Sequence, residues 1–254
     1  MNLTHQNCLL EMTMLRLFKP LAVTAALALC VLFITSCGSG NNAQVRVVNA
    51  IVNSDSSGLD IDVNGTKYFT AVTPGGVQPT PPSYTSVPSG NVAITAFDTG
   101  QTGTTIASGN AGFSGSTQYT VVLDGSAGSS TSTVTSLPDN NTAPTTGNVE
   151  FRIINASQTG PTAVDIYVLP NPSPGDQNVA PNVLSLQPQQ ASSYLSLNYT
   201  ANGYNVIVTP TGVKNYLVNE NYSPATGGII TLVLPDNPNQ TGMSAIPIQL
   251  NDLQ

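Results

Sequence analysis

Residues 59–65, Leu-Asp-Ile-Asp-Val-Asn-Gly, decide the fold class of this chain. Apolar and acidic side chains alternate with a period of two, which places Leu59, Ile61 and Val63 on one face of a β-strand. The Asn-Gly pair that follows is the favoured pair of a tight hairpin turn. The stretch therefore predicts a half-buried strand that enters a hairpin.

Similar segments recur through the rest of the chain. Runs rich in β-branched and aromatic residues, bounded by Gly, Pro and Asn, return roughly every 8 to 15 positions. No stretch after residue 40 has the spacing of a convincing amphipathic helix. The clearest further strands are residues 92–97, 119–123, 204–208 and 229–234.

The first strands of the pattern occur twice. Residues 45–50, Val-Arg-Val-Val-Asn-Ala, are echoed by residues 151–156, Phe-Arg-Ile-Ile-Asn-Ala. Residues 59–63 are echoed in the same way by residues 164–168. Similarity at a nearly constant offset indicates tandem copies of one structural unit.

The two copies also agree further along the chain. Ser83-Tyr84 corresponds to Ser193-Tyr194, and the segment that ends at Asp139 resembles the one that ends at Asp252. The predicted organisation is a signal peptide at residues 1–36, a tether at 37–43, module 1 at 44–138, a polar linker at 139–148 and module 2 at 149–254.

The number of strands predicts the architecture of each module. About seven or eight strands per roughly 100 residues is typical of a sandwich of two sheets. We therefore predict an all-β protein with two tandem immunoglobulin-like antiparallel β-sandwich modules. A closed barrel is the alternative.

The N-terminus has the features of a bacterial lipoprotein signal. Arg16 and Lys19 precede an apolar run at residues 21–34, and the small residues Thr35 and Ser36 come directly before Cys37. We predict that Cys37 is lipidated after cleavage before it. The alternative, a transmembrane anchor, needs about 18–20 apolar residues, which is more than this run supplies.

The residues around this signal bear on sorting and on the start of translation. Gly38 is not the Asp that retains many lipoproteins in the inner membrane, so we expect a lipid-anchored envelope protein in the outer membrane of a two-membrane bacterium. Glu11 fits poorly in such a leader, which makes Met12 and Met14 alternative starts to Met1.

The composition excludes several classes of function. The chain has 6 basic and 13 acidic residues, with charged residues at 7% against roughly a quarter in ordinary domains. Removal of the signal also removes His5, Cys8 and Cys30, which leaves no His and only Cys37. No Ser-His-Asp or Cys-His system and no His/Cys zinc site can be built, and nucleic acid is not an expected partner.

The repeated charges are candidate structural residues. Arg46 with Asp60, and Arg152 with Asp165, stand at matching places in the two copies. If the first two strands of each module pair, each Arg would reach its Asp across the ladder. We predict two structural ion pairs, which would help to fix strand register if they are buried. A ligand site is the alternative.

Asp60 to Gly65 also matches the opening of a calcium-binding EF-hand loop. That loop needs a bidentate acid at its twelfth position, where this chain has Ala71. The second copy has Tyr167 in place of Asp62. We therefore favour a strand and turn, and we expect no metal and no cofactor.

Two further features are candidate recognition surfaces. The Pro-rich segments 74–82 and 170–181 both follow the second predicted strand, so their loops would form one recognition surface or be tolerated insertions. Tyrosines crowd module 2, where they would either pack their rings or stack on sugars. These tyrosines are Tyr194, Tyr199, Tyr204, Tyr216 and Tyr222.

The pattern of apolar-Arg-Val-Val, a small turn region and Val-Asp-Val-Tyr-Val resembles the bacterial surface-protein family catalogued as domain of unknown function 4397. The resemblance covers nearly all of residues 44–254 and implies tandem β modules behind a lipoprotein signal, without an established activity. Family members usually have His-Ala-Ser after the first strand. Residues 49–51 and 155–157 are Asn-Ala-Ile and Asn-Ala-Ser here, so any role of that His is absent.

We therefore expect a non-enzymatic, membrane-anchored envelope lipoprotein that acts in binding or envelope structure. Its partners would be the membrane, through the lipid, and an envelope protein or glycan. The alternatives are a carbohydrate-binding surface module and a hydrolase that uses paired carboxylates.

Overall fold

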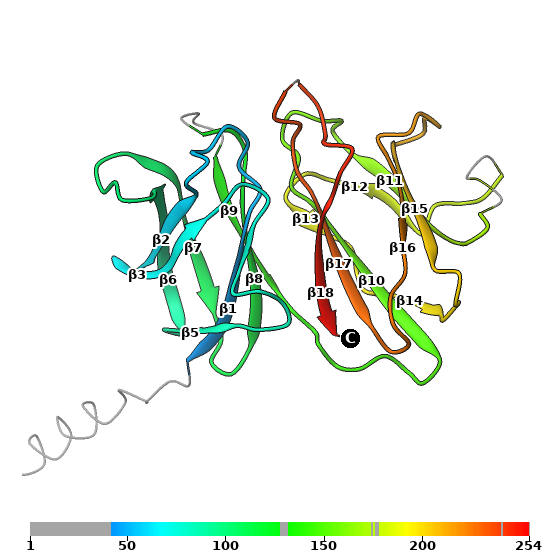
Figure 1. Cartoon of the computed structure of the whole chain (residues 1–254), viewed down its shortest axis with the longest axis horizontal. Helices are drawn as coiled ribbons and strands as arrows, with labels where there is room; N and C mark the ends of the chain where they lie inside the picture. Colours follow the sequence, from blue (N-terminus) through cyan, green and yellow to red (C-terminus); the bar gives the residue numbers. More distant parts are fainter. Residues whose placement is uncertain (1–41, 128–131, 174, 176–177, 240, 254) are drawn as a thin grey trace, which may run out of the picture. The chain divides into compact units, whose positions relative to one another are not determined.

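The computed structural model describes residues 42–253, apart from 128–131, 174, 176–177 and 240 (Figure 1). These residues form eighteen β-strands in four sheets. None of them belongs to a helix that would cross a bilayer. For this part of the chain, the prediction of an all-β fold is confirmed.

Module 1 consists of a five-stranded and a four-stranded sheet. The first has the order β4-β1-β8-β9, with β5 also paired to β1, and the second has the order β3-β2-β6-β7. The strands of the first sheet are β1 (Ala43–Asn49), β4 (Val77–Gln78), β5 (Thr85–Val87), β8 (Gln118–Asp124) and β9 (Thr133–Pro138). Those of the second are β2 (Leu59–Val63), β3 (Thr66–Val72), β6 (Gly90–Asp98) and β7 (Thr105–Phe113).

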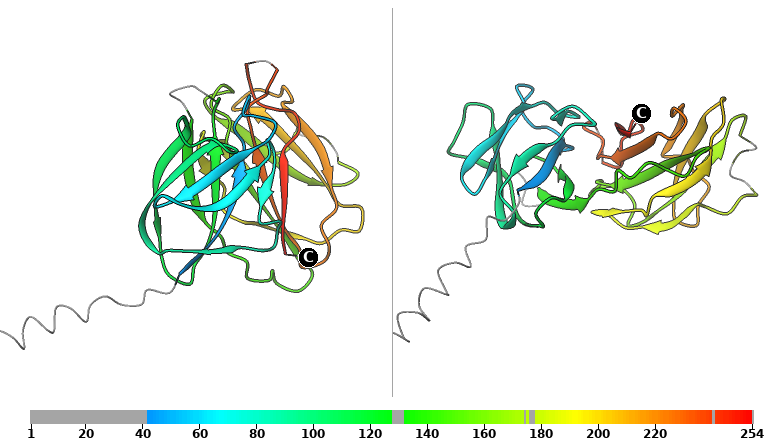
Figure 2. Two further views of the ribbon diagram at one scale, coloured as in Figure 1. Left: turned by 60° about the vertical axis from the view of Figure 1, so that its left-hand side comes forward. Right: turned by 90° about the horizontal axis from the view of Figure 1, so that it is seen from below.

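Module 2 repeats this arrangement. Its five-stranded sheet has the order β13-β10-β17-β18, with β14 also paired to β10, and its four-stranded sheet has the order β12-β11-β15-β16. Figure 2 shows this module, coloured from green through yellow to red, from two further directions. The strands of the first sheet are β10 (Asn148–Asn155), β13 (Gln190–Ala191), β14 (Leu195–Asn198), β17 (Ile229–Leu234) and β18 (Ile248–Leu253). Those of the second are β11 (Val164–Pro170), β12 (Val183–Leu186), β15 (Tyr204–Pro210) and β16 (Val218–Tyr222).

The hairpin that the sequence predicts at residues 59–65 is present. β2 pairs with β3 so that Val63 lies opposite Thr66, and only Asn64 and Gly65 connect them. Both connecting residues have positive φ, 51° and 76°, as a type I′ turn requires. The turn chemistry of Asn-Gly therefore explains the hairpin, and the EF-hand reading is not needed.

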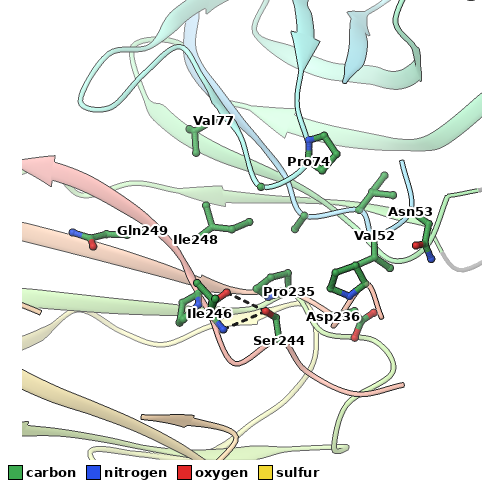
Figure 3. A pocket seen from close by; sticks show the side chains of 15 residues that line it. Val52, Asn53, Pro74, Val77, Pro235, Asp236, Ser244, Ile246, Ile248 and Gln249 are labelled. Carbon is green, nitrogen blue, oxygen red and sulfur yellow. Dashed lines mark hydrogen bonds between the residues drawn. The ribbon is translucent and has the colours of Figure 1, made fainter. Parts of the chain in front are cut away.

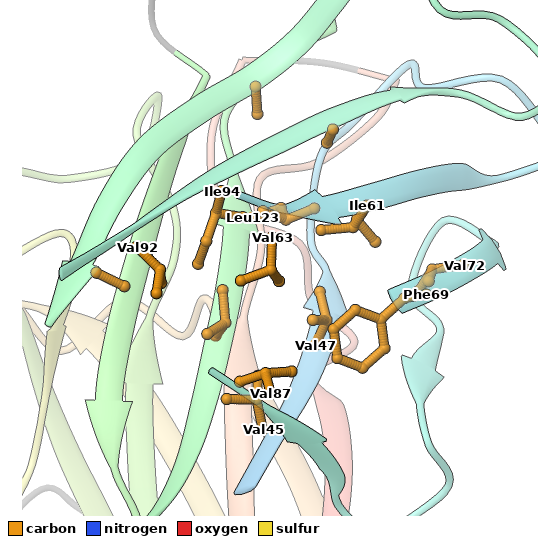
Figure 4. Close-up of a cluster of buried hydrophobic side chains, with 14 of the residues drawn as sticks. Val45, Val47, Ile61, Val63, Phe69, Val72, Val87, Val92, Ile94 and Leu123 are labelled. Atoms are coloured by element: carbon orange, nitrogen blue, oxygen red, sulfur yellow. The ribbon is translucent and has the colours of Figure 1, made fainter. Parts of the chain in front are cut away.

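Each module encloses its own apolar core between its two sheets. In module 1, Val45 and Val47 of β1 point into this core with Ile61 and Phe69 (Figure 4). The strands alternate as the period of two predicts, so the next residue, Val48, points out of the opposite face of β1 and belongs to another cluster.

That other cluster joins the two modules. We call it the seam, and it is formed by Val48, Ala50, Val122, Ile154, Ala156, Val233 and Leu250. The central strands β1, β8, β10 and β17 therefore bury both faces, one in a module core and one in the seam. Burial on both faces explains the pair of adjacent apolar residues near the middle of each strand: Val47-Val48, Val121-Val122, Ile153-Ile154 and Leu232-Val233.

The five-stranded sheet of each module is mixed, which corrects the prediction of purely antiparallel sandwiches, whereas the pairs of the four-stranded sheets are antiparallel. β1 runs parallel to β8, with Val47 opposite Val121, and β10 runs parallel to β17, with Ile153 opposite Leu232. Parallel neighbours need a long connection, and here six other strands separate β1 from β8 in the chain. Local alternation reports that a strand exists but carries no information on this long-range pairing.

Candidate functional site

Two buried arginines stand at equivalent positions on the seam faces of β1 and β10. Arg46 is in register with Thr120 of β8, and Arg152 with Thr231 of β17. Their neighbours along each strand, such as Val47, point into the module cores. The exposed fractions of the arginines are only 0% and 3%, so their charges need partners inside the protein.

Arg46 is held by groups from both modules. Its Nε donates a hydrogen bond to Thr120 Oγ1 at 2.8 Å, and its guanidinium lies 5.1 Å from the ring centre of Tyr84. Nη1 is 2.6 Å from Asp252 Oδ1 and Nη2 is 3.4 Å from Asp139 Oδ2. Both Nη contacts are ion pairs outside hydrogen-bond alignment, so their attraction is Coulombic.

Asp139 connects the modules from the segment predicted as a polar linker. Its Oδ1 accepts a hydrogen bond from Arg152 Nη1 at 2.6 Å. Its Oδ2 accepts hydrogen bonds from Thr120 Oγ1 at 2.7 Å and from Tyr84 Oη at 2.8 Å. The carboxylate is fully shielded from solvent, so the start of this linker is part of the seam.

Asp252 takes the corresponding place in module 2. It lies in β18, and its Oδ2 accepts a hydrogen bond from Thr231 Oγ1 at 2.5 Å. Each arginine thus makes its shortest carboxylate contact with an acid outside its own module, Arg46 with Asp252 and Arg152 with Asp139. The duplicated residues are exchanged across the seam in a near two-fold arrangement.

Tyr84 and Tyr194 complete this arrangement. The Arg152 guanidinium lies 5.2 Å from the ring centre of Tyr194, and Arg152 Nη1 also donates to Tyr194 Oη at 3.2 Å. A desolvated cation over an aromatic face is stabilised by about 2 kcal/mol. Burial raises the pKa of both tyrosines, which therefore remain neutral hydroxyl groups at physiological pH.

Burial and ion pairing act in opposite directions on the charged groups. Burial raises the pKa of Asp252, and Arg46 limits that rise. Burial alone would lower the pKa of Arg46, but the charges of Asp252 and Asp139 outweigh it and the pKa is raised. Arg46 thus stays charged inside the seam, where its loss would leave the buried carboxylate of Asp252 without its arginine partner.

The predicted pairs Arg46–Asp60 and Arg152–Asp165 are not formed, and that prediction was wrong. Asp60 instead contacts Lys67 Nζ at 2.5 Å. β1 and β2 belong to different sheets, as do β10 and β11. The arginines face the seam, whereas the aspartates lie on the sheet at the other side of the core.

Asp165 has no arginine partner and instead organises two turns of module 2. Its Oδ1 accepts hydrogen bonds from Ser185 N at 2.9 Å and Thr211 Oγ1 at 3.1 Å, and its Oδ2 accepts one from Gly212 N at 3.0 Å. Asp60 plays a similar part in module 1, because its Oδ1 accepts a hydrogen bond from Ala71 N at 3.0 Å. Both repeated acids are structural.

The comparison of the two sequence copies already contains the true partners of the arginines, although the predicted ion pairs do not include them. Tyr84 matches Tyr194, and Asp139 matches Asp252, in the comparison of the two copies. In a chain with 7% charged residues, an acid and a tyrosine repeated together with an arginine are the signal of a shared network. The predicted pairs assumed that the first two strands of each module are neighbours in one sheet, which selected Asp60 and Asp165 instead of Asp139 and Asp252.

A groove of about 510 Å³ lies at the edge of the seam, where Val77 and Ile248 line it (Figure 3). Module 1 contributes residues after β1 and before β4, and module 2 contributes the segment between β17 and β18 and the start of β18. The lining is mainly apolar: Ala50, Ile51, Val52, Pro74, Val77, Pro235, Pro238, Ile246, Pro247 and Ile248, with Asn53, Gly75, Asp236, Ser244 and Gln249.

Asp236 is the charged residue of this lining. Its Oδ1 accepts three hydrogen bonds, from Ser157 Oγ at 2.6 Å and from the N and Oγ1 of Thr159, both at 2.9 Å. Its Oδ2 is buried and has no hydrogen-bond partner among the described residues. One oxygen thus fixes the carboxylate, and the other is left without a donor.

The two Pro-rich segments do not form one common surface in the structure, and neither do the tyrosines of module 2. Pro74, Gly75 and Val77 of the first Pro-rich segment line the groove, while residues 170–181 contribute nothing to it. The tyrosines of module 2 form no common platform, because Tyr204 and Tyr222 pack in the core and Tyr194 in the seam.

Two further predictions concern the lipidation of Cys37 and the expectation of no metal site. Cys37 falls outside the described residues, so its lipidation stays a prediction. Within the described ranges, no three His, Cys, Asp or Glu side chains gather as a group that could hold a metal ion.

The fold and the seam define a two-module β-sandwich protein with a buried ionic contact between its modules. Residues 43–167 match the model of the family described as Domain of unknown function (DUF4397), a span that includes module 1 and the beginning of module 2. Module 2 repeats the strand order of module 1, and this family match ends at residue 167 within it.

No curated protein matches this chain. Among solved structures, it is similar to the crystal structure of CBMbc, a family CBM26 module from Eubacterium rectale Amy13K in complex with maltoheptaose. The sequence identity is 10%, the match covers 83% of this chain and 98% of that one, and the TM-score is 0.28. A likeness at this level carries no information on the ligand of this chain.

Proposed function

We propose that this chain is a lipid-anchored envelope protein whose two modules act together as one non-catalytic binding body. A diacylglycerol on Cys37 would hold it at the membrane, and Gly38 favours the outer membrane. The groove beside the seam is the observation that carries the binding role. It is apolar, formed by both modules, and contains a buried carboxylate oxygen without a partner, which are the features of a ligand site.

The distribution of acids favours binding over hydrolysis. Carboxylate-based glycoside hydrolysis needs two acids about 5–10 Å apart that both reach the substrate. Asp139 and Asp252 do converge, but on Arg46 and with side chains shielded from solvent. The groove lining contains a single carboxylate, Asp236.

A glycan ligand is the alternative to a protein or small-molecule partner. The groove lining has no aromatic residue, so sugar stacking there has no support. Tyr199 and Tyr216 are partly exposed, at 40% and 41%. Binding on a glycan array that disappears in both Tyr199→Ala and Tyr216→Ala, but not when groove residues are changed, would favour the glycan.

We also propose that each module has an immunoglobulin-like topology. The two facing sheets of each module support it. The parallel pairs β1–β8 and β10–β17 differ from a purely antiparallel sandwich, so an immunoglobulin-like topology must include one parallel pair in each module.

Membrane anchoring is tested by changing one cysteine. Cys37→Ala should abolish metabolic labelling with palmitate and release the protein from the membrane fraction. Cys30→Ala is the matched control, because it removes the other thiol near the cleavage site and should leave both unchanged. Labelling that survives in Cys37→Ala would overturn the anchoring proposal.

The binding role is tested by site-specific photo-cross-linking of the full chain in intact cells. A photoreactive residue at Ile246, in the groove lining and 74% exposed, should give a discrete cross-linked product. The control site is Leu184, 69% exposed and outside the groove lining. Equal products at the two sites, or none at Ile246, would contradict a binding role for the groove.

A further inference from the structure

We propose that the groove binds a primary ammonium group on an apolar stem, with the ammonium against Asp236 Oδ2 and the stem along the proline and isoleucine walls. The inference rests on the proposed function, in which the groove is the ligand site. It adds the chemical class of the ligand.

The carboxylate of Asp236 is prepared for a donor from outside. Three hydrogen bonds from Ser157 and Thr159 hold Oδ1, so the group cannot turn to satisfy Oδ2 within the protein. A buried acceptor without a partner is costly, and native structures contain few of them. Asp236 is 2% exposed, so a ligand that enters the groove with an N–H group would recover this cost.

The negative charge of the groove indicates that the donor group of the ligand is a cation. The lining contains Asp236 and no Lys or Arg. Arg46 and Arg152 are used in the seam, and Lys67 pairs with Asp60. The chain as a whole carries a formal charge of −7, so an anion is repelled by the protein and by the site, whereas an ammonium ion is attracted to both.

The walls select an apolar stem. Pro74 and Val77 come from module 1, and Pro235, Ile246 and Ile248 from module 2 (Figure 3). Ile246 is the most exposed large apolar side chain of the described residues, at 74%. Covering it removes apolar surface from water, which favours an alkyl stem over a polar one. A lysine side chain and a free alkylamine share this chemistry.

The test uses the full chain and n-hexylammonium as the probe, followed by isoleucine-methyl NMR. We expect the methyl signals of Ile246 and Ile248 to shift with a dissociation constant on the order of 1 mM, as suits a ligand of this size. Hexanoate has the same stem with the opposite charge and should give no shift at these residues. Hexan-1-ol should bind more weakly than hexylammonium.

Asp236→Asn is the decisive variant. Its Oδ1 keeps the bonds from Ser157 and Thr159, while an NH₂ group replaces Oδ2 and meets the ammonium as a second donor. Hexylammonium binding should weaken by about tenfold or more. Unchanged methyl signals of Ile61 and Ile166, which lie in the two module cores, would show that the variant is folded.

A second variant tests the stem without touching the carboxylate. Ile246→Ala should weaken hexylammonium but leave methylammonium unaffected, because only the longer ion reaches that wall. If Asp236→Asn fails to fold, this variant and the comparison with hexanoate still test the proposal. Equal binding of hexylammonium and hexanoate, or shifts that avoid the groove, would overturn it.

Two peptides, which carry Lys or acetyl-Lys between valines, distinguish a lysine of a protein partner from a free amine as the source of the ammonium group. Tighter binding of the Lys peptide than of hexylammonium assigns the site to a protein partner, and equal binding assigns it to a free amine. Cross-linking at Ile246 without any ammonium binding would leave the proposed function intact and overturn this inference alone. Absence of both the cross-link at Ile246 and ammonium binding would overturn the proposed function and this inference together.

Discussion

Asp124 shows how one buried acid responds to its surroundings. It lies at the end of β8, is 1% exposed, and accepts a hydrogen bond from Thr133 Oγ1 at 2.5 Å and another from Gln158 of module 2. Burial raises its pKa to about 6, which these hydrogen bonds limit and the charge of Asp236 assists. Asp124 therefore binds its proton more tightly in the folded chain than in the unfolded one.

This shift predicts a pH dependence of stability. Between pH 4 and 6 the folded state holds a proton that the unfolded state has lost, so the free energy of unfolding falls as pH rises. The shift from 3.8 to about 6 corresponds to at most about 3 kcal/mol. Asp124→Asn should remove this loss, so its stability relative to the unchanged protein should increase from pH 4.5 to pH 7 in urea unfolding. Parallel pH profiles would contradict the shifted pKa.

At the scale of elements, the turns around β15 separate two effects of glycine. Gly203 precedes this strand and Gly212 follows it, and both have positive φ, 72° and 76°. A Cβ at Gly203 would lie 2.4 Å from the carbonyl oxygen of Tyr222, whereas a Cβ at Gly212 would meet no atom within 4 Å. The first position needs glycine for conformation and space, the second for conformation alone.

The two glycines therefore form a matched pair of variants. Gly212→Ala should cost about 1 kcal/mol through the left-handed backbone alone. Gly203→Ala should cost about 3 kcal/mol, because the backbone of β16 must also move away. Chemical denaturation of both variants gives the comparison. Equal losses would show that the space around Gly203 is not limiting.

At the scale of the whole molecule, the seam couples the two modules. Apolar residues of both modules pack there, and the exchanged pairs Arg46–Asp252 and Arg152–Asp139 cross it. Breaking a buried ion pair from one side costs about 3–5 kcal/mol, because a charge is left inside without a partner. The modules should therefore unfold together although each has its own core.

Calorimetry tests this coupling. The unchanged chain should melt in one transition, and Asp139→Ala should separate it into two, because both arginines lose a carboxylate at the seam. Asp55→Ala is the control, since Asp55 is exposed and its carboxylate accepts hydrogen bonds from nearby Ser57. Two transitions in the unchanged chain would contradict coupling through the seam.

The sequence by itself determined the strands, the 59–65 hairpin and the duplication. These depend on alternation, turn residues and repeated letters, which are local properties of the chain. It also determined that residues 37–254 contain no His and, apart from Cys37, no Cys.

Only the tertiary structure decided which strands are neighbours, that β1 and β8 run parallel, and which acids receive Arg46 and Arg152. Asp252 and Arg46 stand near opposite ends of the chain and meet only because two finished modules pack face to face. The groove and the unpartnered oxygen of Asp236 arise from the same contact, and no local pattern encodes it.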